Sequence, residues 1–145
     1  MKKTIASILF ALICISPAMA QDAEEYIAKK YITKKEDTLL YRLLYPQNYG
    51  AKKKYPLIVF LHGAGERGND NKKQLTHGSG LFLKEEVRRD YPAIVIFPQC
   101  PESDFWSSVK ISRGDGSLRF DFEYPREPGK SLQLVTDLIR HLTRM

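Results

Sequence analysis

Two short runs of apolar residues, each preceded by a proline, most constrain what this chain can fold into. Residues 57–61 are Leu-Ile-Val-Phe-Leu, and residues 93–97 are Ala-Ile-Val-Ile-Phe. Continuous apolar runs of this length are typical of strands that are buried on both faces, as parallel strands are. The intervening residues 62–92 are enough for a crossover, with a helix expected over residues 81–89. The pattern therefore predicts a right-handed strand–helix–strand unit and an α/β fold.

The segments on either side of this unit complete the predicted fold. Residues 26–32 and 38–45 are aromatic and aliphatic runs around a polar turn, which predicts an antiparallel hairpin. Residues 98–129 are rich in proline and glycine, and only the alternation of apolar residues over 118–122 indicates a short strand there. Residues 131–144 carry apolar side chains at helical spacing, which predicts an amphipathic helix.

The first twenty residues have the three regions of a secretory signal peptide in order. Residues 1–3 are a short basic start, residues 5–15 are an almost continuous apolar run, and Ala18-Met19-Ala20 forms a cleavage signal before Gln21. The apolar run is too short to span a bilayer as a helix. The sequence therefore predicts an exported protein, periplasmic or extracellular, with no stable membrane anchor.

Removal of that signal peptide leaves one domain, residues 21–145, and changes the charge and the cysteine content. The formal charge falls from +6 to +4, because Lys2 and Lys3 leave with no acidic residue. Cys14 leaves as well, so Cys100 stands alone and no internal disulfide is possible. Apolar residues make up 43% of the chain and charged residues 28%, which excludes a disordered or low-complexity chain. The lysines lie in short runs beside turn residues, so nucleic acid is not an expected partner.

A glycine-rich turn directly after the first apolar run carries the chemistry. Residues 62–68 read His-Gly-Ala-Gly-Glu-Arg-Gly, and the three glycines permit a concave loop lined by backbone N–H groups. A loop at the carboxyl end of a central parallel strand is where open α/β sheets bind ligands. The spacing fits neither common phosphate-binding glycine motif, so we favour an oxyanion hole, in which such N–H groups stabilise a tetrahedral intermediate. Glu66 and Arg67 are expected to pair with each other or to brace this loop.

Further segments accompany the turn: Tyr41-Arg42-Leu43, Tyr45-Pro46, residues 55–61, Asp70-Asn71, Pro98-Gln99-Cys100-Pro101 and Trp106. Together with the turn they resemble the secreted bacterial esterases of the α/β-hydrolase superfamily, also described as predicted peptidases or as phospholipase/carboxylesterase-like proteins. The resemblance covers roughly residues 24–145. It implies hydrolysis of carboxylic esters through a serine acyl-enzyme, with no cofactor. The implied substrates are small-molecule esters or esters linked to glycans or peptides.

The resemblance also assigns roles around the turn. It implies that the amide of Ala64 or Gly65 supplies the oxyanion hole, and that Trp106 helps to wall the substrate cleft. His62 and Gly63 would end the third strand of the superfamily fold. The motif and cleft residues assigned in this way are His62, Gly63, Glu66 and Trp106.

The nucleophile of such enzymes has no counterpart in this sequence. They need a G-x-S-x-G turn, then an acid, then a histidine. Residues 77–80 read His-Gly-Ser-Gly, which has the wrong spacing, and Gly116-Ser117 has no following glycine at the required position. We therefore expect an incomplete α/β-hydrolase fold: an N-terminal antiparallel hairpin, parallel strands and a crossover helix. Such a chain would be truncated before the nucleophile and inactive alone.

The other chemically capable side chains have structural interpretations. His62 is expected to brace the strand end, His77 to lie in a surface loop, and His141 to be a solvated cation in the last helical turn. These histidines are too scattered for a metal site. Ser79 has no base or orienting acid, and Cys100 is expected to be a buried small side chain.

Two further classes of protein stay open. One is a noncatalytic secreted fragment that needs a complementary C-terminal half. The other is a small secreted binding module such as a carbohydrate-binding sandwich, in which residues 57–61 and 93–97 would pair antiparallel. An incomplete sheet would also expose strand edges and apolar faces, which predicts marginal folding or aggregation of the isolated chain.

Overall fold

The computed structural model describes residues 24–125 and 127–144, so the predicted signal peptide lies outside the described residues. In chain order the elements are β1 (Ile27–Ile32), β2 (Thr38–Leu44), β3 (Leu57–Val59), η1 (Ala64–Glu66), η2 (Lys73–Leu75), α2 (Ser79–Leu83), α3 (Glu85–Asp90), β4 (Ile94–Pro98), β5 (Val109–Gly114), β6 (Ser117–Phe122) and α4 (Lys130–Thr143).

The main sheet is mixed and has four strands in the order β1-β2-β4-β3. β1 and β2 form the predicted antiparallel hairpin, and β2 also pairs antiparallel with β4. β3 and β4, which come from the two apolar runs, pair parallel. The prediction of an α/β fold is therefore confirmed. The binding-module alternative required antiparallel pairing of these strands and is not supported.

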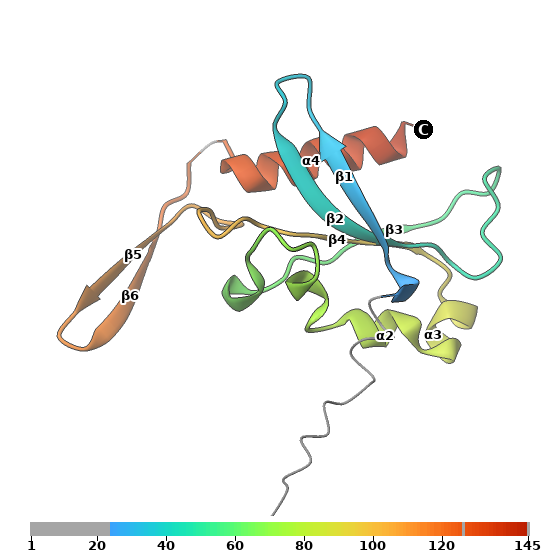
Figure 1. The fold of residues 1–145 in the computed structure, drawn as a ribbon, viewed down its shortest axis with the longest axis horizontal. Helices are drawn as coiled ribbons and strands as arrows, with labels where there is room; N and C mark the ends of the chain where they lie inside the picture. Colours follow the sequence, from blue (N-terminus) through green and yellow to red (C-terminus); the bar gives the residue numbers. More distant parts are fainter. Residues whose placement is uncertain (1–23, 126, 145) are drawn as a thin grey trace, which may run out of the picture.

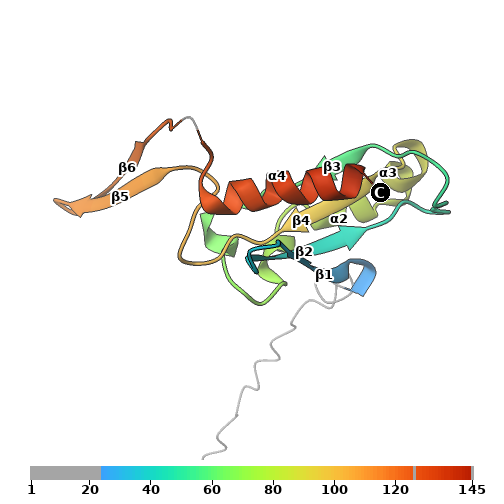
Figure 2. The same cartoon turned by 90° about the horizontal axis from the view of Figure 1, so that it is seen from above.

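The sheet lies between helices and has a hydrophobic core on each face. In Figure 1, α4 lies above the sheet, and α2 and α3 lie below it. Figure 2 shows α4 running along the sheet in the view from above. The core residues on the α4 side are Leu39, Tyr41, Leu43, Ile96, Leu134, Val135 and Leu138. Those on the other side are Tyr26, Leu44, Leu75, Ala93, Val95 and Phe97. β4 contributes to both cores, because successive strand residues point to opposite faces, and it is the strand that the apolar run predicted to be buried on both sides.

β3 is shorter and more exposed than predicted. It ends at Val59, not Leu61, and its three residues are only half-buried. Among the described strands it has a partner on one side only, β4. Just beyond its end, the amide of Phe60 still donates to the carbonyl of Ile96. The prediction that His62 and Gly63 end this strand was therefore wrong, since both lie in the loop beyond it.

The predicted crossover helix is two short helices. α2 and α3 are separated by Lys84, whose backbone is extended (φ −60°, ψ 133°). Glu85 and Glu86 occupy the first turn of α3, where negative side chains stabilise a helix N-terminus. The prediction of one continuous helix over residues 81–89 was wrong, because the acidic pair Glu85-Glu86 marks the start of a second helix.

Residues 98–129 contain a complete hairpin where we predicted a single strand. β5 pairs antiparallel with β6, and the pair extends away from the main sheet (Figure 1). The turn residues Asp115 and Gly116 both have positive φ, 50° and 74°. Such an Asp-Gly turn suits the twist of a two-residue hairpin. This signal was present in the sequence and identifies β5 as well as β6.

Candidate active site

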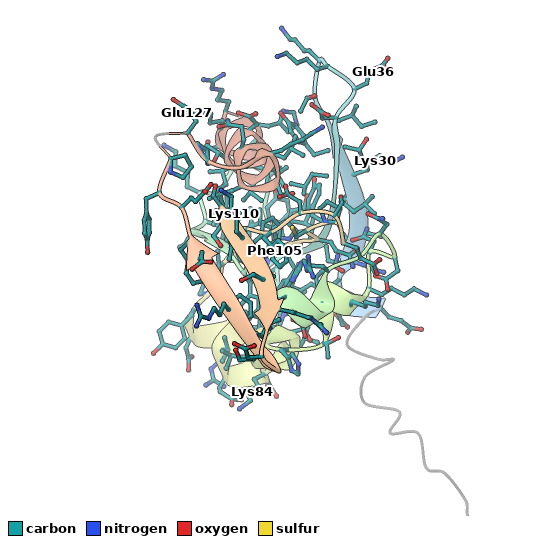
Figure 3. The ribbon with its side chains drawn as sticks, turned by 90° about the vertical axis from the view of Figure 1, so that its left-hand side faces the viewer. Lys30, Glu36, Lys84, Phe105, Lys110 and Glu127 are labelled. Atoms are coloured by element: carbon teal, nitrogen blue, oxygen red, sulfur yellow. The ribbon has the colours of Figure 1, made fainter. Side chains whose placement is uncertain are left out.

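The glycine-rich turn and the loop that follows β4 lie next to each other because β3 and β4 are parallel. Parallel strands bring their carboxyl ends to the same edge of the sheet, where open α/β sheets bind ligands. The turn begins with His62 and contains η1, and the loop after β4 carries Cys100, Phe105 and Trp106. Figure 3, viewed from the hairpin side, shows Phe105 close to the β5–β6 hairpin.

His62 is buried and connects the two loops through both ring nitrogens. Its Nε2 accepts a hydrogen bond from the amide of Cys100 at 3.0 Å. An amide can only donate, so the ring proton is on Nδ1, which donates to the carbonyl of Gly63 at 2.7 Å. The indole Nε1 of Trp106 donates to the carbonyl of His62 at 3.0 Å. The His62 ring thus makes two internal hydrogen bonds and presents no unoccupied nitrogen to a nucleophile.

The carbonyl groups of two successive peptides in the turn are held by side chains. The Gly63 carbonyl accepts from His62, and the Ala64 carbonyl accepts from Nε of Arg67 at 2.9 Å. The described peptide bonds are trans, so each N–H points away from the carbonyl of its own peptide. Fixing these carbonyls therefore also fixes the direction of the Ala64 and Gly65 amides. Within residues 24–125 and 127–144, neither amide donates to any recorded acceptor. Two oriented, unoccupied N–H groups are the donors that an oxyanion hole requires.

Arg67 braces the turn, whereas Glu66 makes its contact elsewhere. Besides the Ala64 carbonyl, the Arg67 guanidinium donates to the carbonyls of Glu102 (2.9 Å) and Asp104 (3.1 Å). It also lies 3.8 Å from the centre of the Phe105 ring. The recorded hydrogen-bond acceptors of Arg67 are backbone carbonyl oxygens, which carry no net charge. Glu66 approaches His77 at 3.5 Å and does not pair with Arg67.

Gln99, to which the sequence gave us no reason to assign a role, fixes the far end of the turn. It is buried, and its amide group donates to Asp70 at 2.8 Å and accepts from the amide of Asn71 at 2.7 Å. Burial acts to raise the pKa of Asp70. The hydrogen bonds from Gln99, Lys73 and Lys72 outweigh that effect and leave the pKa below its ordinary value. The sequence signal that could have identified Gln99 is its place as a polar residue just after a continuous apolar run, where burial and internal hydrogen bonds are expected.

A pocket of about 210 Å³ opens beside Ala64. Its lining residues are Gly63, Ala64, Arg67, Phe105, Trp106, Ser107, Val109, Phe120 and Phe122. Gly63, Ala64 and Trp106 thus meet at one pocket, whereas Gly65 and Glu66 do not line it. The pocket joins a mainly aromatic surface to the Ala64 amide, which is an arrangement suited to an apolar molecule carrying one carbonyl oxygen.

Ser79, Cys100 and His141 do not line this pocket, whereas Ser107 does. The hydroxyl of Ser79 is buried and donates to the Leu75 carbonyl at 2.6 Å. Cys100 is buried too, and that burial raises the pKa of its thiol. The ring of His141 lies 5.5 Å from that of Tyr31 on the surface of α4. Among the described residues, no serine hydroxyl is hydrogen-bonded to a histidine, and no cluster of His, Cys, Asp and Glu could hold a metal ion.

This chain is similar to a solved structure over most of its length. It is the crystal structure of a thermostable esterase, with 32% sequence identity and a TM-score of 0.69. The match covers 86% of this chain and 32% of the esterase, so the chain spans about a third of that protein's length. No protein-family model matches the sequence, and no curated protein matches it. The chain therefore has an esterase-like α/β fold. No helix in the described part of the chain is long and apolar enough to cross a membrane.

Proposed function

We propose that this chain forms the oxyanion-binding side of an esterase site of the α/β-hydrolase type. The observation that carries the proposal is the pair of oriented amides, Ala64 and Gly65, which donate to no acceptor within the described residues. Ala64 also lines a pocket. In ester hydrolysis the carbonyl oxygen becomes negatively charged in the tetrahedral intermediate. Preorganised N–H groups stabilise that charge without having to reorganise.

The proposed chemistry is carboxylic ester hydrolysis through a serine acyl-enzyme, and the nucleophile is supplied by residues outside this chain. Two buried serines support this part of the proposal: within the described residues the hydroxyl of Ser79 donates to the Leu75 carbonyl and that of Ser131 to the Asp104 carboxylate, and neither is recorded bonding to a histidine. The chain alone is proposed to be inactive and to require a complementary segment that carries the G-x-S-x-G turn, the acid and the histidine. The substrate is a small-molecule, glycan-linked or peptide-linked ester, and neither nucleic acid nor a membrane takes part.

A chimaera tests the proposal directly. Residues 24–144 of this chain replace the matching third of the thermostable esterase, so that the esterase supplies the missing segment. We expect the chimaera to hydrolyse 4-nitrophenyl butanoate and to react with a fluorophosphonate probe, and the chain alone to do neither. Reaction of the probe with a serine of the chain alone would overturn the proposal.

The Ala64→Pro substitution isolates the oxyanion role within the chimaera. Proline removes the amide proton and fits the first position of a helical turn. Gly63 before it is already extended (φ −76°, ψ 178°), as a residue preceding proline must be. Loss of one oxyanion donor lowers kcat by roughly 10²–10³-fold. The matched variant Ala64→Gly keeps the N–H and is expected to retain most activity.

We also propose export through a cleavable signal peptide, on the basis of the basic, apolar and Ala-Met-Ala regions of residues 1–20. Expression with the complete N-terminus in a bacterial host is expected to yield a product that begins at Gln21 outside the cytoplasm. The intact mass of that product checks the cleavage site. Ala20→Lys, which places a large charged residue at the cleavage position, is expected to block processing.

A further inference from the structure

The β5–β6 hairpin has one apolar face and one polar face. The register pairs Val109 with Phe122 and Ile111 with Phe120, so these side chains point to the same side. The apolar residues on this face are Val109, Ile111, Leu118, Phe120 and Phe122, with Arg113 beside Leu118 near the turn. The polar residues on the other face are Lys110, Ser112, Arg119 and Asp121. Phe120 and Phe122 are 49% and 55% exposed. An exposed apolar surface of this kind marks a place where something binds.

This apolar face is continuous with the candidate active site. Val109, Phe120 and Phe122 line the same pocket as Ala64. Phe105 and Trp106 line its other side, and the Trp106 indole is held there by the hydrogen bond from its Nε1 to the His62 carbonyl. The pocket thus has four aromatic side chains among its walls, and its lining includes Ala64, whose amide donates to no recorded acceptor in the described residues.

We infer that this pocket binds the single-ring aromatic acyl group of an ester, with the hairpin as one wall and the ester carbonyl directed at the Ala64 amide. The inference rests on the proposed function, because it assigns a substrate class to the same site. Aromatic walls favour a flat ring, which gains edge or stacking contacts that a short alkyl chain does not. The volume, about 210 Å³, is below the roughly 300 Å³ at which pockets for larger ligands begin, so the pocket takes one ring and not a polymer segment.

Trp106 provides the measurement, because it is the only tryptophan in the sequence. The full chain is titrated with ethyl 3-phenylpropanoate, and with ethyl propanoate as the ester that lacks the ring. We expect a saturable change in Trp106 emission with the aromatic ester, and binding of the ringless ester at least about tenfold weaker. Binding requires no nucleophile, so the titration is independent of hydrolysis.

Paired substitutions on the hairpin test which surface binds. Phe120→Ser removes a ring from the apolar face, and Arg119→Ser removes a side chain of similar length from the polar face of the same strand. The first is expected to weaken binding of the aromatic ester about tenfold, a change of ~1.4 kcal/mol, and the second to leave binding unchanged. Phe122→Ser is a second test on the apolar face. Far-ultraviolet circular dichroism of each variant checks that the fold is retained.

Several outcomes would overturn the inference: no saturable change, equal affinity for both esters, or equal effects of Phe120→Ser and Arg119→Ser. It is also overturned if Trp106 emission depends on protein concentration and Phe120→Ser removes that dependence, since a second copy then covers the hairpin.

Failure of the proposed function gives a different result from failure of this inference. An inactive chimaera together with normal binding of the aromatic ester rejects the esterase chemistry and leaves the binding site in place.

Discussion

The ring of His62 accepts a hydrogen bond from the backbone amide of Cys100, and this bond joins the loop that follows β3 to the loop that follows β4. The Gly68 amide, which donates to the Cys100 carbonyl at 2.9 Å, makes a second connection between the same loops. Trp106 is held to the His62 carbonyl. His62 is therefore a buried structural link that, together with the Gly68 amide and Arg67, fixes the glycine-rich turn relative to the loop after β4.

The first prediction concerns that link. His62→Ala leaves the buried Cys100 amide without its acceptor, which costs ~1–3 kcal/mol of unfolding free energy. Urea unfolding followed by Trp106 fluorescence measures the loss. His141→Ala removes an exposed histidine from α4 and is expected to change stability by less than about 0.5 kcal/mol. Equal effects of the two substitutions would show that His62 does not connect the loops.

The second prediction concerns the start of α4, which is capped by a residue distant in sequence. Gly129, the residue before the helix, provides no side-chain cap. Asp104 accepts instead from the amide of Ser131 at 3.0 Å and from its hydroxyl at 2.6 Å. Asp104→Asn removes the negative charge from the helix N-terminus, and we expect a loss of ~0.5–2 kcal/mol at neutral pH.

The same carboxylate predicts a pH dependence. Burial acts to raise the pKa of Asp104, but hydrogen bonds from Ser131 and Phe105 and the charge of Lys130 lower it below its ordinary value. A lowered folded-state pKa contributes stability above the unfolded value of about 3.9, and that stability is lost as the pH falls through the folded value. Stability of the natural chain should therefore fall in acid more steeply than that of Asp104→Asn. Some dependence remains in the variant, because the pKa of Asp70 is lowered too. Parallel pH profiles would contradict this assignment.

The sequence pattern predicted most of the strands and α4, although the local signals for the start of α3 and for the β5–β6 turn were overlooked. Features set by tertiary contacts were missed. The apolar run at residues 93–97 identified the central strand, because burial on both faces leaves no room for polar residues. The capping of α4 by Asp104 joins groups 27 residues apart and has no local signature. The glycine-rich turn indicated a concave loop of backbone amides, and the resemblance to α/β-hydrolase esterases implied that Ala64 or Gly65 supplies the donor. Neither showed that His62 and Arg67 orient these amides, since that depends on where two loops meet.

The third prediction concerns close packing at a glycine. Gly78 has a φ of 82°, and a Cβ there would lie 2.6 Å from the ring of Phe60. That ring is itself stacked on Phe97 with centroids 4.7 Å apart, so it has little freedom to move. Gly78→Ala therefore combines backbone strain with a clash and is expected to lower the free energy of unfolding by ~2–5 kcal/mol.

The control is Gly116, which has a similar φ of 74° with nothing within 4 Å of its Cβ position. Gly116→Ala should therefore show only the strain, ~1–2 kcal/mol. Thermal unfolding of both variants separates the two effects.

The last prediction concerns the open edge of β3. Among the described strands β3 has no partner on its outer side, and Leu61 just beyond it is 39% exposed. Unpaired strand edges beside apolar side chains promote association, and a lysine at such an edge opposes it. We expect the natural chain to form larger species as its concentration rises, and Leu61→Lys to reduce this in light scattering. Leu81→Lys introduces the same charge at a more exposed leucine on α2, and it is expected to leave association unchanged. A monodisperse natural chain that melts cooperatively as a monomer would show that the β3 edge needs no cover.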